Sequence, residues 1–308
     1  MAAPSAANSR TIRSLELTLA DGRTLGYAEY GDRHGWPLVY LHGFPGSRLA
    51  GGVIDEAARA AGVRVLAPER PGLGRSSPQP GRTLLDHAAD VRALVEELGI
   101  SRFAVLGESG GGPYALACAH ALPEQVECAA VVCGLGRVGC AGWTDGIATK
   151  ERIGYALARR APLCAGWALV PIAAWARLRP HAFLHVTRWQ LGDADREVLR
   201  GSLGDLVAAD FAEAFRQGGR GAGQDLALLF RPWPFEPAAI RVPVVFLHGT
   251  ADRTVSLAAT QGLAASLPGA QLRVFEGHGH FSLLAGKAEE VLRVMRPVAT
   301  PAGARLSS

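Results

Sequence analysis

Apolar positions along the chain change their spacing several times, and each spacing predicts a kind of element. Residues 15–19 alternate apolar and polar side chains, Asp21-Gly22 follows, and residues 24–30 form a second extended segment. This pattern predicts an antiparallel hairpin. Residues 37–41 are apolar almost without interruption, as expected for a strand that is buried on both faces of a sheet.

Strands and helices then alternate. Further strands are predicted at residues 63–67, 103–106 and 126–133, and helices at residues 53–61, 83–98 and 114–119. Residues 83–98 have the clearest helical spacing of apolar side chains, and Gly99 closes that segment. Repeated strand–helix units predict an α/β protein with a mostly parallel central sheet and helices on both faces.

The alternation stops between residues 136 and 237. This segment has several helical stretches and no convincing strand, and its tryptophans are Trp143, Trp167, Trp175, Trp189 and Trp233. The glycine-rich residues 217–223 predict a flexible loop inside it. Strands at 242–247 and 271–275 and helices at 255–267 and 283–295 then resume the earlier pattern.

These patterns predict four parts of the chain. An α/β core comprises residues 11–135 and 238–296, and residues 136–237 form an inserted helical cap over one end of the sheet. Residues 1–10 and 297–308 are rich in Ala, Ser, Gly or Pro and are expected to be flexible tails.

Composition narrows the possible partners. The chain has 308 residues, 48% of them hydrophobic, which is enough for one large core with an insertion. The net charge is +4, but the 32 Lys and Arg residues are scattered and do not alternate with aromatic residues. Nucleic acid is therefore not an expected partner. Residues 1–10 lack the apolar core of a signal peptide, and charged residues and prolines interrupt the apolar segment 154–175. We expect a cytoplasmic protein without a membrane span.

The cysteines give no sign of a metal site or of a disulfide framework. They number 5, contain no close CxxC pair and are expected to be free, mostly buried thiols: Cys118, Cys128, Cys133, Cys140 and Cys164. The cysteines therefore argue against a zinc site, and the serine chemistry considered next is expected to need no metal and no cofactor.

The candidate nucleophile is Ser109. It stands in a Gly-x-Ser-x-Gly pattern between a predicted strand and a predicted helix, which is the arrangement of a nucleophile elbow. Such a serine sits in a strained backbone conformation, so Gly107 and Gly111 are expected to let other chain segments approach closely.

A serine nucleophile needs a histidine base and a carboxylate that orients the base. Asp252 follows the strand at 242–247 and is the expected acid; Asp145 lies well inside the insertion, and Glu108 adjoins the nucleophile. The base is His280 or His278, which both follow the last strand. Both choices keep the order serine, acid, histidine that this architecture requires.

An oxyanion also needs hydrogen-bond donors. The N–H of Gly110, directly after the nucleophile, is one candidate. The second is the N–H of Phe44 in the turn His42-Gly43-Phe44-Pro45-Gly46, which follows the strand at 37–41. His42 and His248 are expected to hold loops in place and not to react.

As a set, these segments resemble the α/β-hydrolase superfamily. The resemblance covers nearly the whole core and rests on residues 42–46, 70–76, 107–111, 248–252 and 279–281. It implies the nucleophile Ser109, the acid Asp252, the base His280 and the oxyanion donors Phe44 and Gly110. The Gly-His-Phe sequence selects His280 over His278. Serine at the elbow counts against the epoxide hydrolases and haloalkane dehalogenases of the superfamily, which use aspartate there.

The expected function is hydrolysis of a small carboxylic ester or similar acyl compound, through an acyl-enzyme on Ser109. The Trp- and Leu-rich insertion favours an apolar acyl or aromatic group. A carbon–carbon bond hydrolase, an aminopeptidase and a non-catalytic ligand-binding protein remain alternatives. An aminopeptidase would need an acidic cluster in the insertion. The acidic residues there have the spacing of a solvated helix face: Asp193, Asp195, Glu197, Asp205, Asp210 and Glu213.

Overall fold

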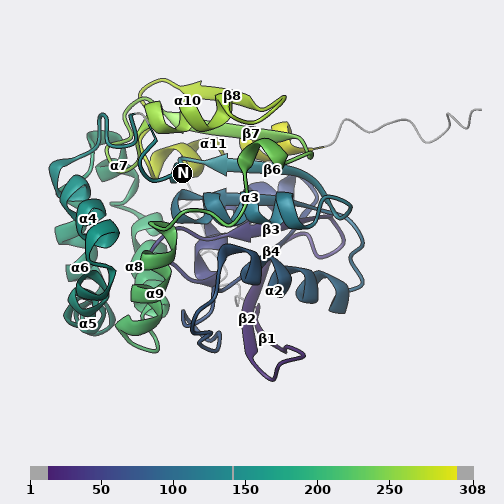
Figure 1. Cartoon of the computed structure of the whole chain (residues 1–308), viewed down its shortest axis with the longest axis horizontal. Helices are drawn as coiled ribbons and strands as arrows, with labels where there is room; N and C mark the ends of the chain where they lie inside the picture. Colours follow the sequence, from purple (N-terminus) through teal and green to yellow (C-terminus); the bar gives the residue numbers. More distant parts are fainter. Residues whose placement is uncertain (1–12, 141, 297–308) are drawn as a thin grey trace, which may run out of the picture.

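A computed structural model describes residues 13–140 and 142–296, so the tails predicted at 1–10 and 297–308 lie outside the described residues. Eight strands form one sheet in the order β1-β2-β4-β3-β5-β6-β7-β8 (Figure 1). Their bounds are β1 (Arg13–Thr18), β2 (Thr24–Gly31), β3 (Trp36–Leu41), β4 (Val63–Pro68), β5 (Phe103–Glu108), β6 (Val126–Val132), β7 (Val244–Gly249) and β8 (Gln271–Phe275). Strands β1 and β2 form the predicted antiparallel hairpin. From β4 to β8 all neighbours are parallel, as predicted.

Two apolar layers sandwich the sheet. The helical elements of this part are η1 (Arg48–Ile54), α1 (Asp55–Ala60), α2 (Leu84–Glu97), η2 (Ser109–Gly111), α3 (Gly112–Ala121), η3 (Pro237–Ala239), α10 (Leu257–Ala265) and α11 (Ser282–Met295). Buried side chains of α2, α3 and α10 pack with Phe103 and Val105 on one face. Those of η1, α1 and α11 pack with Ala104 and Leu106 on the other. Successive residues of β5 therefore point into opposite layers, because strand side chains alternate.

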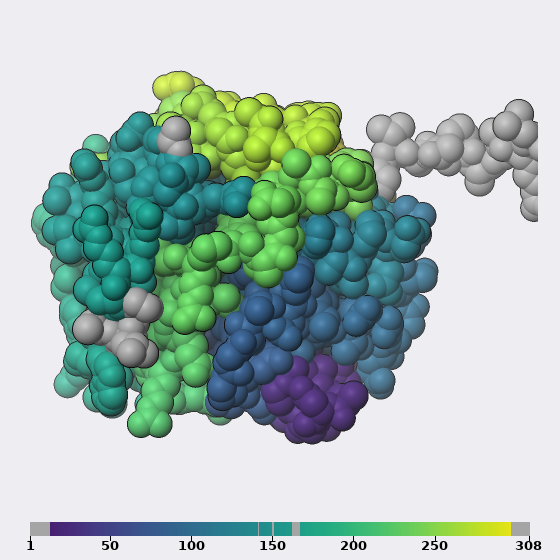
Figure 2. Space-filling view, viewed as in Figure 1, coloured from purple at the N-terminus to yellow at the C-terminus, as the bar shows by residue number. Residues whose placement is uncertain are grey.

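In the described part of the chain, six α-helices and the short η3 lie between β6 and β7. The α-helices are α4 (Thr149–Arg160), α5 (Pro162–Leu178), α6 (Pro180–Arg188), α7 (Asp193–Val198), α8 (Ser202–Ala214) and α9 (Gly219–Leu229). They gather beside one end of the sheet (Figure 1). In the space-filling view, the green surface at the end of the insertion, which includes α9, lies directly against the blue surface of the core segment that precedes β5 (Figure 2). Within the described ranges, no helix has both the length and the apolar character needed to cross a membrane.

The prediction of a flexible loop at residues 217–223 is wrong, because α9 begins at Gly219. The glycines there serve close packing. A Cβ at Gly221 would lie 2.0 Å from the carbonyl oxygen of Gly72, and a Cβ at Gly219 would lie 2.8 Å from that of Leu169. These residues are therefore small because other backbone segments touch the first turns of the helix.

Candidate active site

Ser109 occupies a sharp turn between β5 and α3. Its φ is +53°, in the left-handed region that side-chain-bearing residues rarely adopt. A Cβ at Gly107 would lie 2.3 Å from the carbonyl oxygen of Gly111, and a Cβ at Gly111 would lie 2.0 Å from that of Leu41. Both glycines are thus required by close backbone approaches, as predicted for an elbow.

Three loops bring a histidine and a carboxylate to this serine. His280 Nε2 lies 2.9 Å from Ser109 Oγ, and His280 Nδ1 lies 2.9 Å from Asp252 Oδ2. The side chains come from the ends of β5, β7 and β8, and His280 and Asp252 are buried. The rival His278 is half-buried, and its Nδ1 lies 3.0 Å from the carbonyl oxygen of Glu276. The structure therefore brings His280 to Ser109 and directs His278 elsewhere.

Asp252 is held from several sides. Its Oδ1 accepts hydrogen bonds from the N–H groups of Thr254 (2.7 Å) and Val255 (2.9 Å), and His248 Nε2 lies 3.4 Å from its Oδ2. Burial opposes ionisation, but His280, His248 and the N–H bonds outweigh it and lower the pKa of Asp252. The carboxylate is thus held as an anion facing the imidazole.

His280 is correspondingly favoured as a cation. Burial alone would lower its pKa, but the negative charges of Asp252, Asp195 and Glu108 outweigh burial and raise the pKa to about 9. This environment stabilises the imidazolium that forms when the histidine removes a proton from a serine.

The residues that carry the two predicted oxyanion donors lie close together. A Cβ at Gly110 would lie 3.2 Å from the backbone nitrogen of Phe44. Within the described part of the chain, the Phe44 N–H has no hydrogen-bond acceptor. An unpaired N–H of this kind is able to donate a hydrogen bond to a developing negative charge.

A buried arginine holds the turn that carries Phe44. Arg70 Nη1 donates to the carbonyl oxygen of His42 (2.5 Å), and Nη2 donates to that of Gly43 (2.8 Å). Its Nε donates to Asp225 Oδ2 at 2.9 Å, and neither side chain is exposed. Asp225, which lies in α9, also accepts from Arg82 Nη2 (2.7 Å) and from the Tyr114 hydroxyl (2.6 Å).

A second aspartate of the insertion reaches the end of the same turn. Asp210 Oδ1, in α8, accepts hydrogen bonds from the N–H (2.8 Å) and the hydroxyl (2.6 Å) of Ser47. Asp210 and Ser109 both line a small cavity of about 50 Å³. Burial raises the pKa of Asp210 to about 7, because the hydrogen bonds from Ser47 only partly offset the cost of a buried charge.

The acidic residues of the insertion do not form a single solvated face. Asp193, Glu197 and Asp205 are exposed, but Asp195 and Asp210 are buried. The pattern contained a signal for Asp210, which lies three residues after the buried Val207 and four before the buried Ala214. It therefore belongs to the inward face of α8. Sequence reasoning missed Asp195, Asp210, Asp225 and Arg70 as parts of this site.

Glu108 and a cluster of three possible metal ligands also lie near Ser109, and both have partners within the protein. Glu108 is buried and accepts a hydrogen bond from the Tyr40 hydroxyl, and burial raises its pKa. Cys133, His248 and Asp252 bring possible metal-ligand atoms within 4.8 Å of one another. Because Asp252 faces His280 and His248 lies beside Asp252, we interpret this cluster as support for the acid.

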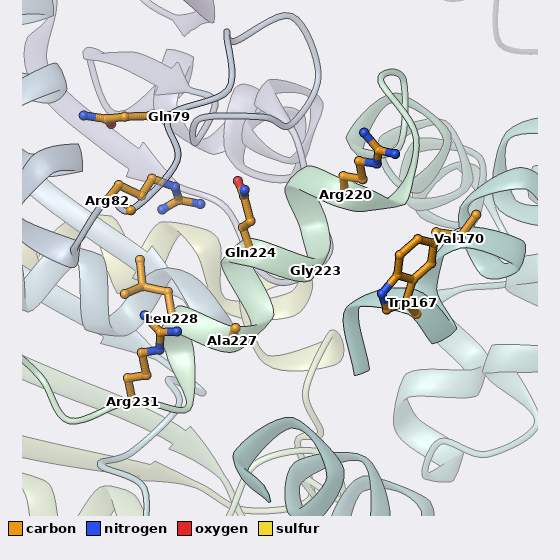
Figure 3. Close-up of a pocket in the computed structure, with 11 residues that line it drawn as sticks. Gln79, Arg82, Trp167, Val170, Arg220, Gly223, Gln224, Ala227, Leu228 and Arg231 are labelled. Atoms are coloured by element: carbon orange, nitrogen blue, oxygen red, sulfur yellow. The ribbon is translucent and has the colours of Figure 1, made fainter. Parts of the chain in front are cut away.

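A larger cavity lies elsewhere, between α5, α9 and the segment before α2. Its volume is about 630 Å³, and among its lining residues are Arg82, Trp167, Arg220, Gln224 and Arg231 (Figure 3). The residues around the Ser109 cavity include Phe44, Leu206, Val207 and Phe281 but no tryptophan. The apolar wall beside Ser109 is therefore built from leucine, valine and phenylalanine, and not from the tryptophans of the insertion.

Comparison with known proteins shows to which family this chain belongs. A family model described as alpha/beta hydrolase fold matches residues 37–287. A pimeloyl-[acyl-carrier protein] methyl ester esterase of Aromatoleum aromaticum is 32% identical over 230 residues, which cover 73% of this chain and 83% of that protein. The chain belongs to the α/β-hydrolase fold family.

Other similarities are more local or more distant. A proline iminopeptidase of Xylella fastidiosa is 38% identical over 115 residues, but the match covers only 35% of this chain and 36% of that relative. The crystal structure of a hydrolase from Pseudomonas aeruginosa superposes with a TM-score of 0.69 at 20% identity, and covers 92% of this chain and 98% of that one. The structural likeness supports the fold alone.

Proposed function

We propose that this protein is a serine hydrolase that cleaves carboxylic esters or similar small acyl compounds through an acyl-enzyme on Ser109. The observation that carries the proposal is the continuous contact from Ser109 Oγ through His280 to Asp252, with 2.9 Å at each step. A serine hydroxyl becomes a nucleophile when an oriented base removes its proton. The ester named for the Aromatoleum aromaticum relative supports the same substrate class.

In the proposed reaction, which needs the neutral form of His280, Ser109 Oγ attacks the carbonyl carbon while His280 Nε2 accepts the hydroxyl proton. The N–H groups of Phe44 and Gly110 stabilise the oxyanion, and Asp252 stabilises the imidazolium. His280 then gives its proton to the leaving oxygen, and the acyl group stays on Ser109. His280 next deprotonates a water molecule, which attacks the acyl carbon. As the bond between that carbon and Ser109 Oγ breaks, His280 returns the proton to Oγ and the acid is released.

The neighbourhood of the serine favours an apolar acyl group. Phe44, Leu206, Val207 and Phe281 line its cavity, and apolar walls stabilise apolar groups by removing their surface from water. With about 50 Å³ of space, the cavity holds only a small part of such a substrate, so we expect the insertion to move when substrate enters.

The test is covalent labelling with a fluorophosphonate probe, followed by an assay with p-nitrophenyl esters of increasing chain length. We expect the wild type to be labelled and Ser109→Ala to be unlabelled. The two histidines of one loop provide a matched pair: His280→Ala should reduce kcat by about 10⁴-fold or more, and His278→Ala should change it little. An unlabelled wild type, or loss of activity only in His278→Ala, would contradict the proposal.

An aminopeptidase is the second candidate, because Asp210 places a buried carboxyl group on the same cavity as Ser109. An ionised carboxylate there would attract a substrate ammonium group. The comparison of an amino acid p-nitroanilide with its N-acetylated form separates the candidates. Hydrolysis that needs the free amine, and that is lost selectively in Asp210→Asn, would favour the aminopeptidase.

A further inference from the structure

Asp195 of the helical insertion binds the backbone of the loop that carries His280. Its Oδ2 accepts a hydrogen bond from the N–H of His280 at 2.9 Å. Its Oδ1 accepts from the N–H groups of Phe281 (3.0 Å) and Ser282 (2.9 Å). One carboxylate of α7 thus satisfies three successive N–H groups that lie more than eighty residues further along the chain.

Among the described residues, Asp195 is the acceptor for all three of these N–H groups. Phe281 and Ser282 stand at the start of α11, where the first N–H groups of a helix have no helical carbonyl to bind. Asp195 is 1% exposed, so water does not replace it there. Hydrogen bonds to an ionised carboxylate are shorter and stronger than neutral ones, and three of them fix the local backbone.

The loop is shaped to receive this carboxylate. A Cβ at Gly279 would lie 2.4–2.5 Å from the carboxylate atoms of Asp195, so a larger residue would displace it. The N–H of Gly279 instead donates to the Ser282 hydroxyl at 2.7 Å. Glycine at position 279 thus allows the loop to close over Asp195.

We propose that Asp195 is a positioning residue for His280, through which the helical insertion holds the imidazole between Asp252 and Ser109. This inference rests on the proposed role of His280 as the base. Asp195 does not touch the reacting atoms and acts through the backbone of residues 280–282. Because α7 lies in the insertion, the alignment of the base depends on the insertion being seated on the sheet domain.

The charge of Asp195 provides a second effect on the imidazole. The groups whose charges act on His280 are Asp252, Asp195, Glu108 and His248; the three carboxylates raise the pKa of His280 against its burial. Removal of one carboxylate should therefore lower that pKa and move the acidic limb of the activity profile to lower pH. A residue that only caps α11 would change the stability of the fold without reducing kcat.

The test compares Asp195→Asn with Asp193→Asn, a control on the same helix whose side chain is exposed. Asparagine offers one acceptor oxygen and no charge. We expect Asp195→Asn to reduce kcat for a p-nitrophenyl ester by about tenfold or more with a smaller change in KM, because a small misplacement of a catalytic group is costly. Its acidic limb should move to lower pH, and Asp193→Asn should match the wild type.

An NMR titration of the His280 ring, assigned with His280→Gln, makes the result independent of the chemistry. A lower His280 pKa in Asp195→Asn is expected even if the wild type hydrolyses nothing, and failure of fluorophosphonate labelling would then contradict only the proposed function. An Asp195→Asn protein with an unchanged His280 titration and unchanged kcat would overturn the positioning role, even if its Tm were lower. Should that variant not fold, Gly279→Ala displaces the same carboxylate without removing its charge and is expected to give the same loss of kcat.

Discussion

Two buried aspartates of the helical insertion support the turn at residues 42–47: Asp225 acts through Arg70, and Asp210 binds Ser47 directly. Asp225 is 0% exposed and Asp210 is 5% exposed. Burial raises the pKa of both, but Arg70 and Arg82 outweigh it at Asp225 and lower its pKa well below the usual range. Among the described residues, Asp210 accepts hydrogen bonds only from Ser47, and its pKa rises to about 7.

The comparison shows that partners, and not depth, decide whether a buried carboxyl group is a permanent anion. The negative charge of Asp225 is paired with buried arginines. It fixes the position of Arg70, whose guanidinium donates to the carbonyl oxygens of His42 and Gly43 in the turn. At Asp210 the charge is unmatched, so its ionisation depends on pH near neutrality. The same insertion thus contacts one turn through a rigid ionic network and through a titratable hydrogen bond.

Loss of the matched charge should have the largest effect. Asp225→Asn leaves two buried guanidinium groups without their anion, so we expect the free energy of unfolding to fall by about 3–5 kcal/mol. Urea denaturation measures this change. The control Asp205→Asn, at a side chain that is 77% exposed, should stay within about 0.5 kcal/mol of the wild type. A loss below about 1 kcal/mol in Asp225→Asn would show that burial alone does not make the pairing essential.

Replacing the Arg70 guanidinium while keeping a positive charge at position 70 should affect activity more than stability. Lysine at position 70 keeps a cation beside Asp225, but a single ammonium cannot reproduce the planar set of donors. We expect Arg70→Lys to reduce kcat for a p-nitrophenyl ester by about 10- to 100-fold, because the turn that carries the Phe44 N–H loses its alignment. The surface replacement Arg59→Lys is the control. An unchanged kcat would show that Arg70 does not align the turn that carries Phe44.

The unpaired carboxyl group of Asp210 should make the free energy of unfolding depend on pH. Asp210 has a higher pKa when folded than when unfolded, so the native state binds its proton more tightly and loses stability as pH rises from about 4 to about 7. Asp210→Asn removes this term. The difference in unfolding free energy between variant and wild type should grow with pH over that range, by at most about 1.4 kcal/mol per pH unit. A difference that does not vary with pH would contradict the raised pKa.

Local pattern was sufficient for the sheet and for the residues at its strand ends. The alternation at 15–19, the uninterrupted apolar run at 37–41 and the elbow at 107–111 each depend on side chains within a few positions. Strand order and the carboxyl-end rule then placed Ser109, Asp252 and His280 at one edge of the sheet. The geometry brings these three side chains together, with His280 and not His278 beside the serine.

The helical insertion shows where such reasoning ends. Asp193 and Asp195 are two residues apart in one helix, yet one is exposed and the other binds the backbone of residues 280–282. Spacing defines which residues share a helix face, but only the seating of α7 on the sheet domain decides which face turns inward. The glycines at 219 and 221, predicted to be a loop, are helical because backbone segments from Leu169 and Gly72 pack against them.

The sequence by itself therefore determined the α/β core and the candidate nucleophile, acid and base, since these follow from short-range periodicity and from the order of the strands. The tertiary structure alone decided which charges of the insertion are buried and what each of them holds. The physical reason is that a buried carboxylate is tolerated only where donors from distant segments converge on it. That convergence, at Asp195, Asp210 and Asp225, arises from packing across more than eighty residues of chain.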